Sequence, residues 1–113
     1  MKLVFLYHPV KNLKESLRHY REVLGFEEAW REGDHTAALK MNTDVQLLIE
    51  EDEQDLAAGG VFLVDSVDDF YKENHMKFEF IKKPKSIPPG RYAVCKDWNG
   101  NFIRLIDFTN ENE

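Results

Sequence analysis

The chain has 113 residues, of which 42% are hydrophobic and 32% are charged, and its formal net charge is -6. This length accommodates one domain with one core, and the composition is that of an ordinary globular protein. The negative charge argues against a nucleic-acid-binding or membrane-surface protein, because phosphates and anionic lipid would repel it. Lys82, Lys83 and Lys85 form the densest basic stretch. We interpret it as a solvated strand end, with a phosphate-binding patch as the alternative.

The sequence predicts a cytoplasmic protein. Cys95 is the single cysteine, so no intrachain disulfide forms, and a reducing compartment fits. Its apolar neighbours predict a buried, inert thiol. Residues 1–7 are apolar but too short for a secretory signal, and no window approaches the length of a membrane span.

The first half of the chain predicts one strand, one helix and three more strands. Residues 3–7 are an apolar run, typical of a strand covered on both faces. Asn12, followed by Glu15, is a helix-capping pattern, and apolar residues then recur at helical spacing up to Gly25, which suits a helix end. Residues 26–31, 36–41 and 45–50 are the expected strands, separated by polar turns.

The second half repeats this order. Residues 61–64 and 78–81 are expected strands, with a short helix between them that Ser66 caps. Residues 84–90 are an expected loop, because Pro88 and Pro89 rule out a central strand. Residues 92–96 and 102–107 form a hairpin around Asn99-Gly100, a strong turn signal.

The repeated order predicts an α+β fold of two βαβββ modules, whose curled mixed sheets surround a cleft. Module one covers about residues 1–52 and module two about residues 60–108. We expect residues 1–113 to form a single domain.

Three segments carry a family resemblance. LKESLRHYREVLGF at residues 13–26, VDSVD at residues 64–68 and GRYAVCKDWNGNFIRL at residues 90–105 stand in the right order. They resemble the first helix, the second helix entry and the final hairpin of the vicinal oxygen chelate superfamily, which includes glyoxalase I, fosfomycin-resistance enzymes, extradiol dioxygenases and bleomycin-binding proteins. Trp98 replaces the proline usual in the hairpin turn.

The resemblance implies four positions that hold a divalent metal in metal-dependent members. They fall on Phe5, Leu47, Gly59 and Arg104, none of which suits a cation. We therefore expect no metal and no other cofactor. A two-residue slip in the alignment stays on the same strand face and does not supply a ligand set. His8 and Glu50 are the nearest ligands, and by this alignment each points to the opposite face.

Without a metal, the cleft becomes an apolar pocket with one cation. Aromatic walls and the guanidinium of Arg104 suit a flat ligand with an anionic group. We expect the ligand-binding residues to be Phe5, Tyr7, Leu47, Ile49, Trp98, Phe102 and Arg104. The alternative is that these side chains fill the core.

Three functions remain open at this point. The first is a metal-free protein that binds a small, anionic or aromatic molecule. The second is a metal-dependent lyase or dioxygenase, and the third is a structural or regulatory partner domain. The resemblance also implies a homodimer, which open sheet edges make physically reasonable.

Overall fold

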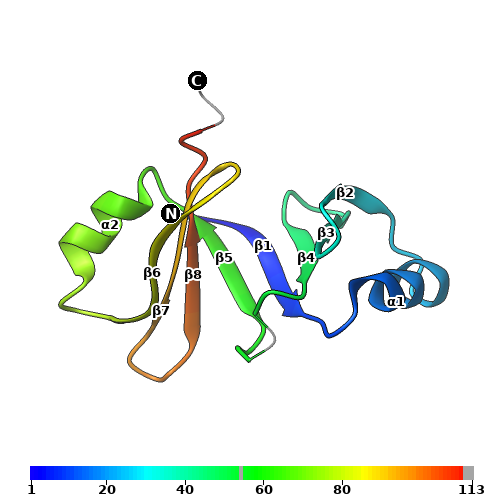
Figure 1. Cartoon of the computed structure of the whole chain (residues 1–113), viewed down its shortest axis with the longest axis horizontal. Helices are drawn as coiled ribbons and strands as arrows, with labels where there is room; N and C mark the ends of the chain where they lie inside the picture. Colours follow the sequence, from blue (N-terminus) through cyan, green and yellow to red (C-terminus); the bar gives the residue numbers. More distant parts are fainter. Residues whose placement is uncertain (54, 111–113) are drawn as a thin grey trace. The chain divides into compact units, whose positions relative to one another are not determined.

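The computed structural model describes residues 1–53 and 55–110. The predicted domain of residues 1–113 therefore lies partly outside the described residues. The chain divides into two compact units, Phe5–Ala58 (the first unit) and Met1–Val4 with Gly59–Glu113 (the second unit). Each unit has the predicted order of strand, helix and three strands, so the α+β class and the repeated βαβββ order are confirmed (Figure 1).

The first unit packs helix α1 against four strands, the first of which enters this unit at Phe5. β1 (Lys2–Pro9), β2 (Glu28–Glu32), β3 (Thr36–Leu39) and β4 (Gln46–Glu50) follow the order β2-β3-β4-β1. β1 pairs parallel with β4, and the other pairs are antiparallel. The buried core under the helix consists of Leu13, Leu17, Ala37, Leu39, Leu47 and Ile49.

The helix of the first unit begins as the sequence predicts. The Asn12 side chain accepts a hydrogen bond from the Glu15 backbone N–H, and α1 (Leu13–Arg18) follows. The helix then widens into the π-helical turn η1 (His19–Val23), which sequence periodicity did not indicate. Gly25 ends it with a φ of 77°, a left-handed conformation that glycine adopts at little cost.

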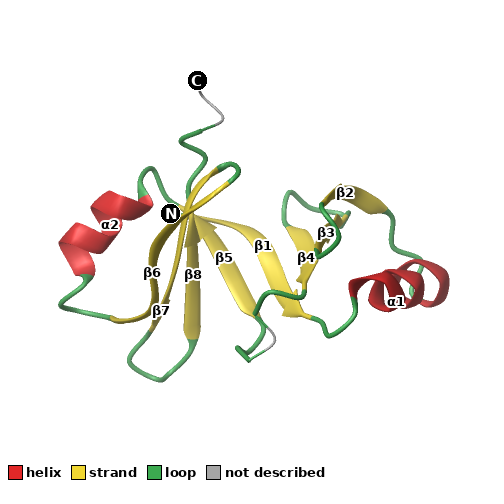
Figure 2. Ribbon diagram, viewed as in Figure 1, coloured by secondary structure: helices red, strands yellow, loops and turns green. Residues whose placement is uncertain are grey.

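The second unit has the sheet order β5-β8-β7-β6, with α2 (Val67–Asn74) on one face. Its strands are β5 (Gly59–Leu63), β6 (Glu79–Ile87), β7 (Gly90–Lys96) and β8 (Phe102–Ile106). Figure 2 shows α2 beside these strands. Val67, Ala93, Cys95 and Leu105 form the buried core beneath it.

The prediction of a loop over residues 84–90 is wrong for most of that range. β6 continues to Ile87 and passes through Pro84. Register shifts between Phe80 and Lys82, and between Lys82 and Lys85, interrupt its pairing with β7. Proline is tolerated there because β6 ends the strand order of its sheet.

No helix in the described part of the chain is long and apolar enough to cross a membrane.

Candidate functional site

One face of the first unit's sheet gathers aromatic and polar side chains. The strand register pairs Phe5 with Gln46, and Tyr7 with Leu48. Paired positions on neighbouring strands share a face of the sheet, and here it is the face opposite α1. β2 and β3 extend the same face. We call it the ring face, and its members are Phe5, Tyr7, Trp30, Thr36, Gln46, Leu48 and Glu50.

A pair of aromatic rings, one of which is hydrogen-bonded to Gln46, forms one part of the ring face. The rings of Phe5 and Trp30 meet edge to face, with centroids 6.0 Å apart and an interplanar angle of 76°. The indole N–H of Trp30 donates to the Gln46 side-chain oxygen at 2.9 Å. Trp30 is 37% exposed and Phe5 is half-buried. The indole is thus held in place while its surface stays accessible.

The Glu50 carboxylate, with two hydroxyl groups that donate to it, forms the other part of the ring face. The Tyr7 hydroxyl donates to Glu50 Oε1 at 2.5 Å, and the Thr36 hydroxyl donates to Oε2 at 2.6 Å. Burial raises the pKa of Glu50 above its usual value, although both hydrogen bonds act to lower it. Asp52 and Glu53 add negative charge nearby and raise that pKa further.

The register corrects part of the predicted site. Leu47 and Ile49 do not share a wall with Phe5 and Tyr7, because the side chains of Leu47 and Ile49 pack under α1. A one-residue shift between parallel strands sends every side chain to the other face. The same shift brings Glu50 onto the ring face, where the sequence alignment had not placed it.

His8 lies on the opposite face from the ring face. It pairs with Ile49, and its Nδ1 lies 3.2 Å from the Tyr20 hydroxyl oxygen. His8 and Glu50, the two nearest ligand candidates in the sequence, therefore lie on opposite faces of one sheet.

The donor set does not fit a divalent metal ion. Within residues 1–53 and 55–110, no three His, Cys, Asp or Glu side chains come together as a group that could hold one. Leu48, rather than Leu47, shares the ring face with Phe5, and leucine offers no donor at either position. The expected absence of a metal stays a prediction.

The remaining predicted site residues lie in the second unit, where Phe102 and Arg104 share the face of β8 opposite α2 and Trp98 lies apart from them. Arg104 pairs with Val61 in the sheet and is 0% exposed. Phe102 is half-buried and lies beneath the Lys96 ammonium, with Nζ 5.6 Å from its ring centroid. Trp98 is 81% exposed and meets Phe78, whose ring packs against the core under α2. The structure therefore places Trp98 with α2 and Phe102 on another part of the sheet.

The Cys95 thiol is buried, as predicted. It is 1% exposed and belongs to the core beneath α2. Burial, assisted by the negative charge of Asp97, raises its pKa to about 11. The thiol is therefore protonated at neutral pH, and the reactive thiolate is scarce.

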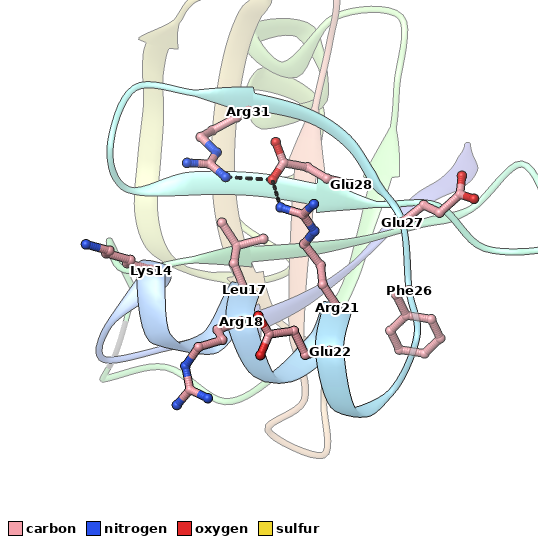
Figure 3. A pocket seen from close by; sticks show the side chains of 9 residues that line it. All are labelled: Lys14, Leu17, Arg18, Arg21, Glu22, Phe26, Glu27, Glu28 and Arg31. Atoms are coloured by element: carbon pink, nitrogen blue, oxygen red, sulfur yellow. Dashed lines mark hydrogen bonds and ion pairs between the residues drawn. The ribbon is translucent and has the colours of Figure 1, made fainter.

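A surface pocket of about 770 Å³ lies between the helix of the first unit and β2 (Figure 3). It is lined by Lys14, Leu17, Arg18, Arg21, Glu22, Phe26, Glu27, Glu28 and Arg31. Glu28 Oε1 accepts a hydrogen bond from Arg31 at 2.7 Å and lies 4.0 Å from Arg21 Nη1. The hydrogen bond to Glu28 raises the pKa of Arg31. Because Glu28, at the side of the pocket formed by β2, is already paired with Arg21 and Arg31, we do not favour this pocket as the functional site.

The raised pKa of Glu50 leads to a prediction of how the free energy of unfolding changes with pH. A carboxyl group whose pKa is higher in the folded state stabilises the fold at low pH, and this contribution is lost as the pH rises through the folded pKa. Relative to Glu50→Gln, the wild type should lose free energy of unfolding as the pH rises from about 4, the ordinary pKa of a glutamate, towards neutrality. Urea unfolding of both proteins across this range measures the difference.

Glu51 offers a control of opposite sign. The hydrogen bond from the Leu13 backbone N–H lowers the pKa of Glu51 most, and the hydrogen bond with His35 lowers it further. Relative to Glu51→Gln, the wild type should therefore gain free energy of unfolding as the pH rises. Parallel pH curves for wild type and Glu50→Gln would show that Glu50 titrates as it does in the unfolded chain.

Comparisons with known proteins agree with this architecture. The sequence profile of the Glyoxalase/Bleomycin resistance protein/Dioxygenase superfamily matches residues 3–105. No curated protein sequence matches the chain at a significant level.

Solved structures similar to the chain cover almost all of it. An NAD-dependent benzaldehyde dehydrogenase from Legionella pneumophila has a TM-score of 0.74 and 19% identity, over 92% of this chain and 97% of that one. A methylmalonyl-CoA epimerase from Streptomyces coelicolor, in complex with 2-nitronate-propionyl-CoA, has a TM-score of 0.69 and 18% identity, over 95% and 96%. A glyoxalase superfamily member from Vibrio splendidus 12B01 has a TM-score of 0.61 and 18% identity, over 94% and 97%. At these identities the likeness shows the fold alone.

Proposed function

Because the chain belongs to the Glyoxalase/Bleomycin resistance protein/Dioxygenase superfamily, we propose that it is a metal-free member that binds a small molecule with a flat aromatic ring. The observation that carries this proposal is the Phe5–Trp30 pair on the ring face. Its indole is fixed by Gln46 and is still 37% exposed. A ring that is already ordered loses little conformational freedom when a flat ligand stacks on it.

The other ring-face groups suit the polar end of such a ligand. The Glu50 carboxyl group and the Thr36 hydroxyl lie together on this face, and their hydrogen bond holds the carboxyl group in one orientation. Burial and a raised pKa favour the protonated, donating form of Glu50 more than in solution. A ligand oxygen is a suitable partner for that proton.

The names of the similar structures do not indicate a substrate for this chain. Their names denote a benzaldehyde dehydrogenase and a methylmalonyl-CoA epimerase, two different reactions on one fold. A metal-dependent lyase or dioxygenase is the alternative within the superfamily, and it lacks a donor set among the described residues. A structural or regulatory partner domain is the other alternative. Homodimer formation and a cytoplasmic location are also proposals.

Two tryptophans allow a matched test of the proposal. We expect the neutral aromatic probe phenylnaphthylamine to bind the wild type and to quench its tryptophan fluorescence. Loss of one aromatic contact should weaken binding about tenfold in Trp30→Ala. Trp98→Ala should bind as the wild type does, because Trp98 packs on the α2 side of the other unit. Probe fluorescence titration measures both dissociation constants.

Other results would oppose the proposal in distinct ways. Equal weakening in Trp30→Ala and Trp98→Ala would place binding elsewhere. A melting temperature that one of Ni, Zn, Mn or Fe(II) raises and a chelator lowers would favour the metal-dependent enzyme. Absence of probe binding to the wild type, without a metal effect, would favour the partner-domain alternative.

A further inference from the structure

The surface pocket beside α1 lies on the face of the first unit's sheet that is opposite the ring face. Ala37 and Leu39 of β3 pack under α1, and they pair with Arg31 and Glu28 of β2. Because paired positions share a face of the sheet, these two β2 side chains lie on the helix side and line the pocket. We call it the arginine pocket, and its members are the nine residues labelled in Figure 3. A ligand bound there would leave the ring face free.

Four cations line the arginine pocket. Three belong to the helix and one to β2, and they are Lys14, Arg18, Arg21 and Arg31. Three of the five arginines of the chain are therefore at one place. The first 31 residues hold six lysines and arginines against four glutamates, a net charge of +2 in a chain whose net charge is -6. The pocket is thus a local concentration of positive charge in an acidic protein.

Two of these arginines converge on one carboxylate oxygen. Glu28 Oε1 accepts a hydrogen bond from Arg31 Nη2 at 2.7 Å and lies 4.0 Å from Arg21 Nη1 (Figure 3). The two nitrogens are therefore at most 6.7 Å apart, the sum of these two distances. Two charge-assisted hydrogen bonds of about 2.8 Å each, together with the width of an oxyanion, span this separation. One anionic group can thus accept from both arginines.

The Glu28 carboxylate orders both guanidinium groups and leaves donors on each. A guanidinium group carries five N–H donors, and the contact with Glu28 involves one nitrogen of each arginine. The side chains of Arg21 and Arg31 are 54% and 46% exposed, so a ligand can reach them. The pairing of Glu28 argues against the pocket as the main functional site, but it leaves donors for a second ligand.

The irregular helix is an independent indication of a ligand at this pocket. The regular helix α1 ends at Arg18, and the π-helical turn His19–Val23 follows it. This turn carries Arg21 and Glu22, which both line the pocket. Single π-helical turns are rare and are found frequently at functional sites.

The other charges of the pocket favour an anion with more than one negative charge. Glu22, Glu27 and Glu28 also line it, and Glu27 Oε2 lies 3.5 Å from Lys40 Nζ. Four cations exceed these three carboxylates by one, so a monoanion gains little by binding. A phosphate monoester carries about −1.5 to −2 charges at pH 7 and has three acceptor oxygens, and the Coulomb energy grows with that charge.

The size and the apolar part of the pocket favour an organic molecule over a bare ion. The volume of about 770 Å³ lies within the range of small-molecule pockets, about 300–1,000 Å³. Leu17 and Phe26 line the pocket beside the charged side chains. They offer apolar surface to the organic part of a ligand whose anionic group contacts the arginines.

We propose that the arginine pocket binds a small organic phosphate monoester, whose phosphate group accepts hydrogen bonds from Arg21 and Arg31 and whose organic part lies against Leu17 and Phe26. The proposal goes beyond the aromatic ligand of the ring face, because the two sites share no residue and lie on opposite faces of one sheet. The negative charge of the whole chain disfavours phosphates of a nucleic acid or a membrane surface, so the phosphate belongs to a small molecule in solution.

Monobutyl phosphate tests the proposal, because it has a phosphate group and a short apolar chain but no aromatic ring. Phosphorus NMR titration should show that it binds the wild type, and more tightly than inorganic phosphate does. Arg21→Gln with Arg31→Gln should raise its dissociation constant about tenfold or more, because both guanidinium contacts are lost. Added salt should weaken the complex.

Glu28→Gln gives a second test, which loss of folding cannot imitate. The glutamine keeps an oxygen that can accept from Arg31, and it removes a negative charge beside the bound phosphate. Monobutyl phosphate should therefore bind about threefold to tenfold more tightly than to the wild type.

Matched controls separate local contact from overall charge. Lys72→Gln with Lys77→Gln makes the same change in net charge at exposed positions of the second unit, and it should leave monobutyl phosphate binding unchanged. Circular dichroism melts confirm that each variant is folded. Trp30→Ala should weaken the neutral aromatic probe and not the phosphate, while the double arginine variant should do the reverse, so each proposal can fail without the other.

Four results would overturn the proposal of a phosphate site. They are no monobutyl phosphate binding by the wild type, equal weakening by the double lysine control, unchanged affinity in Glu28→Gln, and sedimentation of the protein with phosphatidic acid vesicles. The last result would assign the pocket to a lipid headgroup instead of a small molecule in solution.

Discussion

Gly90→Ala should lower the free energy of unfolding by about 3 kcal/mol, because an added methyl group meets rigid backbone. An ideal Cβ at Gly90 would lie 2.5 Å from the Asp107 carbonyl oxygen and 2.9 Å from the Thr109 backbone N. It would also clash with the Asp107 side chain. The two backbone atoms cannot move aside as the end of a side chain can, and hydrogen bonds from Val67 and Arg91 hold the Asp107 carboxylate in place. Urea unfolding followed by circular dichroism measures the loss.

Gly33→Ala is the control for this substitution. A Cβ at Gly33 meets nothing within 4 Å, but the φ of 60° is one that L-residues rarely adopt. The backbone strain alone should cost about 1 kcal/mol. Equal destabilisation of Gly33→Ala and Gly90→Ala would mean that the contacts at Gly90 relax without cost.

Local signals in the sequence predicted the order of elements well. Asn12 and Ser66 each accept a backbone hydrogen bond at a helix start, as their positions indicated. Gly25 and the Asn99-Gly100 turn also lie at element ends. These signals act within a few residues, so a single sequence contains them completely.

The ring face could not be predicted because it depends on a long-range register. β1 and β4 are separated by almost the whole first unit, and no local pattern says whether Phe5 pairs with Gln46 or with Leu47. One residue of offset decides which face a side chain occupies. Predicting Leu47 instead of Gln46 therefore removed Glu50 from the expected site. The apolar run in β4 gave no sign of this wrong register, since side chains on both faces of that strand are buried.

The common face of Lys82 and Lys85 was missed for a related reason. Lys82 and Lys85 are three residues apart, a spacing that places them on opposite faces of a regular strand. The register shift between them restores both to one face. Pro84 had suggested a loop at this point, and an irregular edge strand is the structure that accommodates both the proline and the shift. A shift of this kind is visible only in the pairing with β7.

Asp107→Ala should lower the free energy of unfolding by about 4 kcal/mol, because it leaves buried donors without their acceptor. The Asp107 carboxylate accepts from the backbone N–H groups of Val67 and Arg91, each at 2.8 Å, and from the Thr109 hydroxyl at 2.9 Å. These donors belong to the start of α2, the start of β7 and the segment after β8. One side chain that is 1% exposed therefore ties three parts of the second unit together.

The same carboxylate predicts how the loss varies with pH. Burial alone would raise the pKa of Asp107, but the hydrogen bonds from Val67, Arg91 and Thr109 outweigh it and lower the pKa. The stability from this group is therefore present above the unfolded pKa and is lost as the pH falls through the folded pKa. The gap between wild type and Asp107→Ala should narrow in acid, as urea unfolding at several pH values would show. A gap that stays constant down to about pH 3 would mean that the carboxylate's charge contributes nothing and that its hydrogen bonds work equally well in the protonated form.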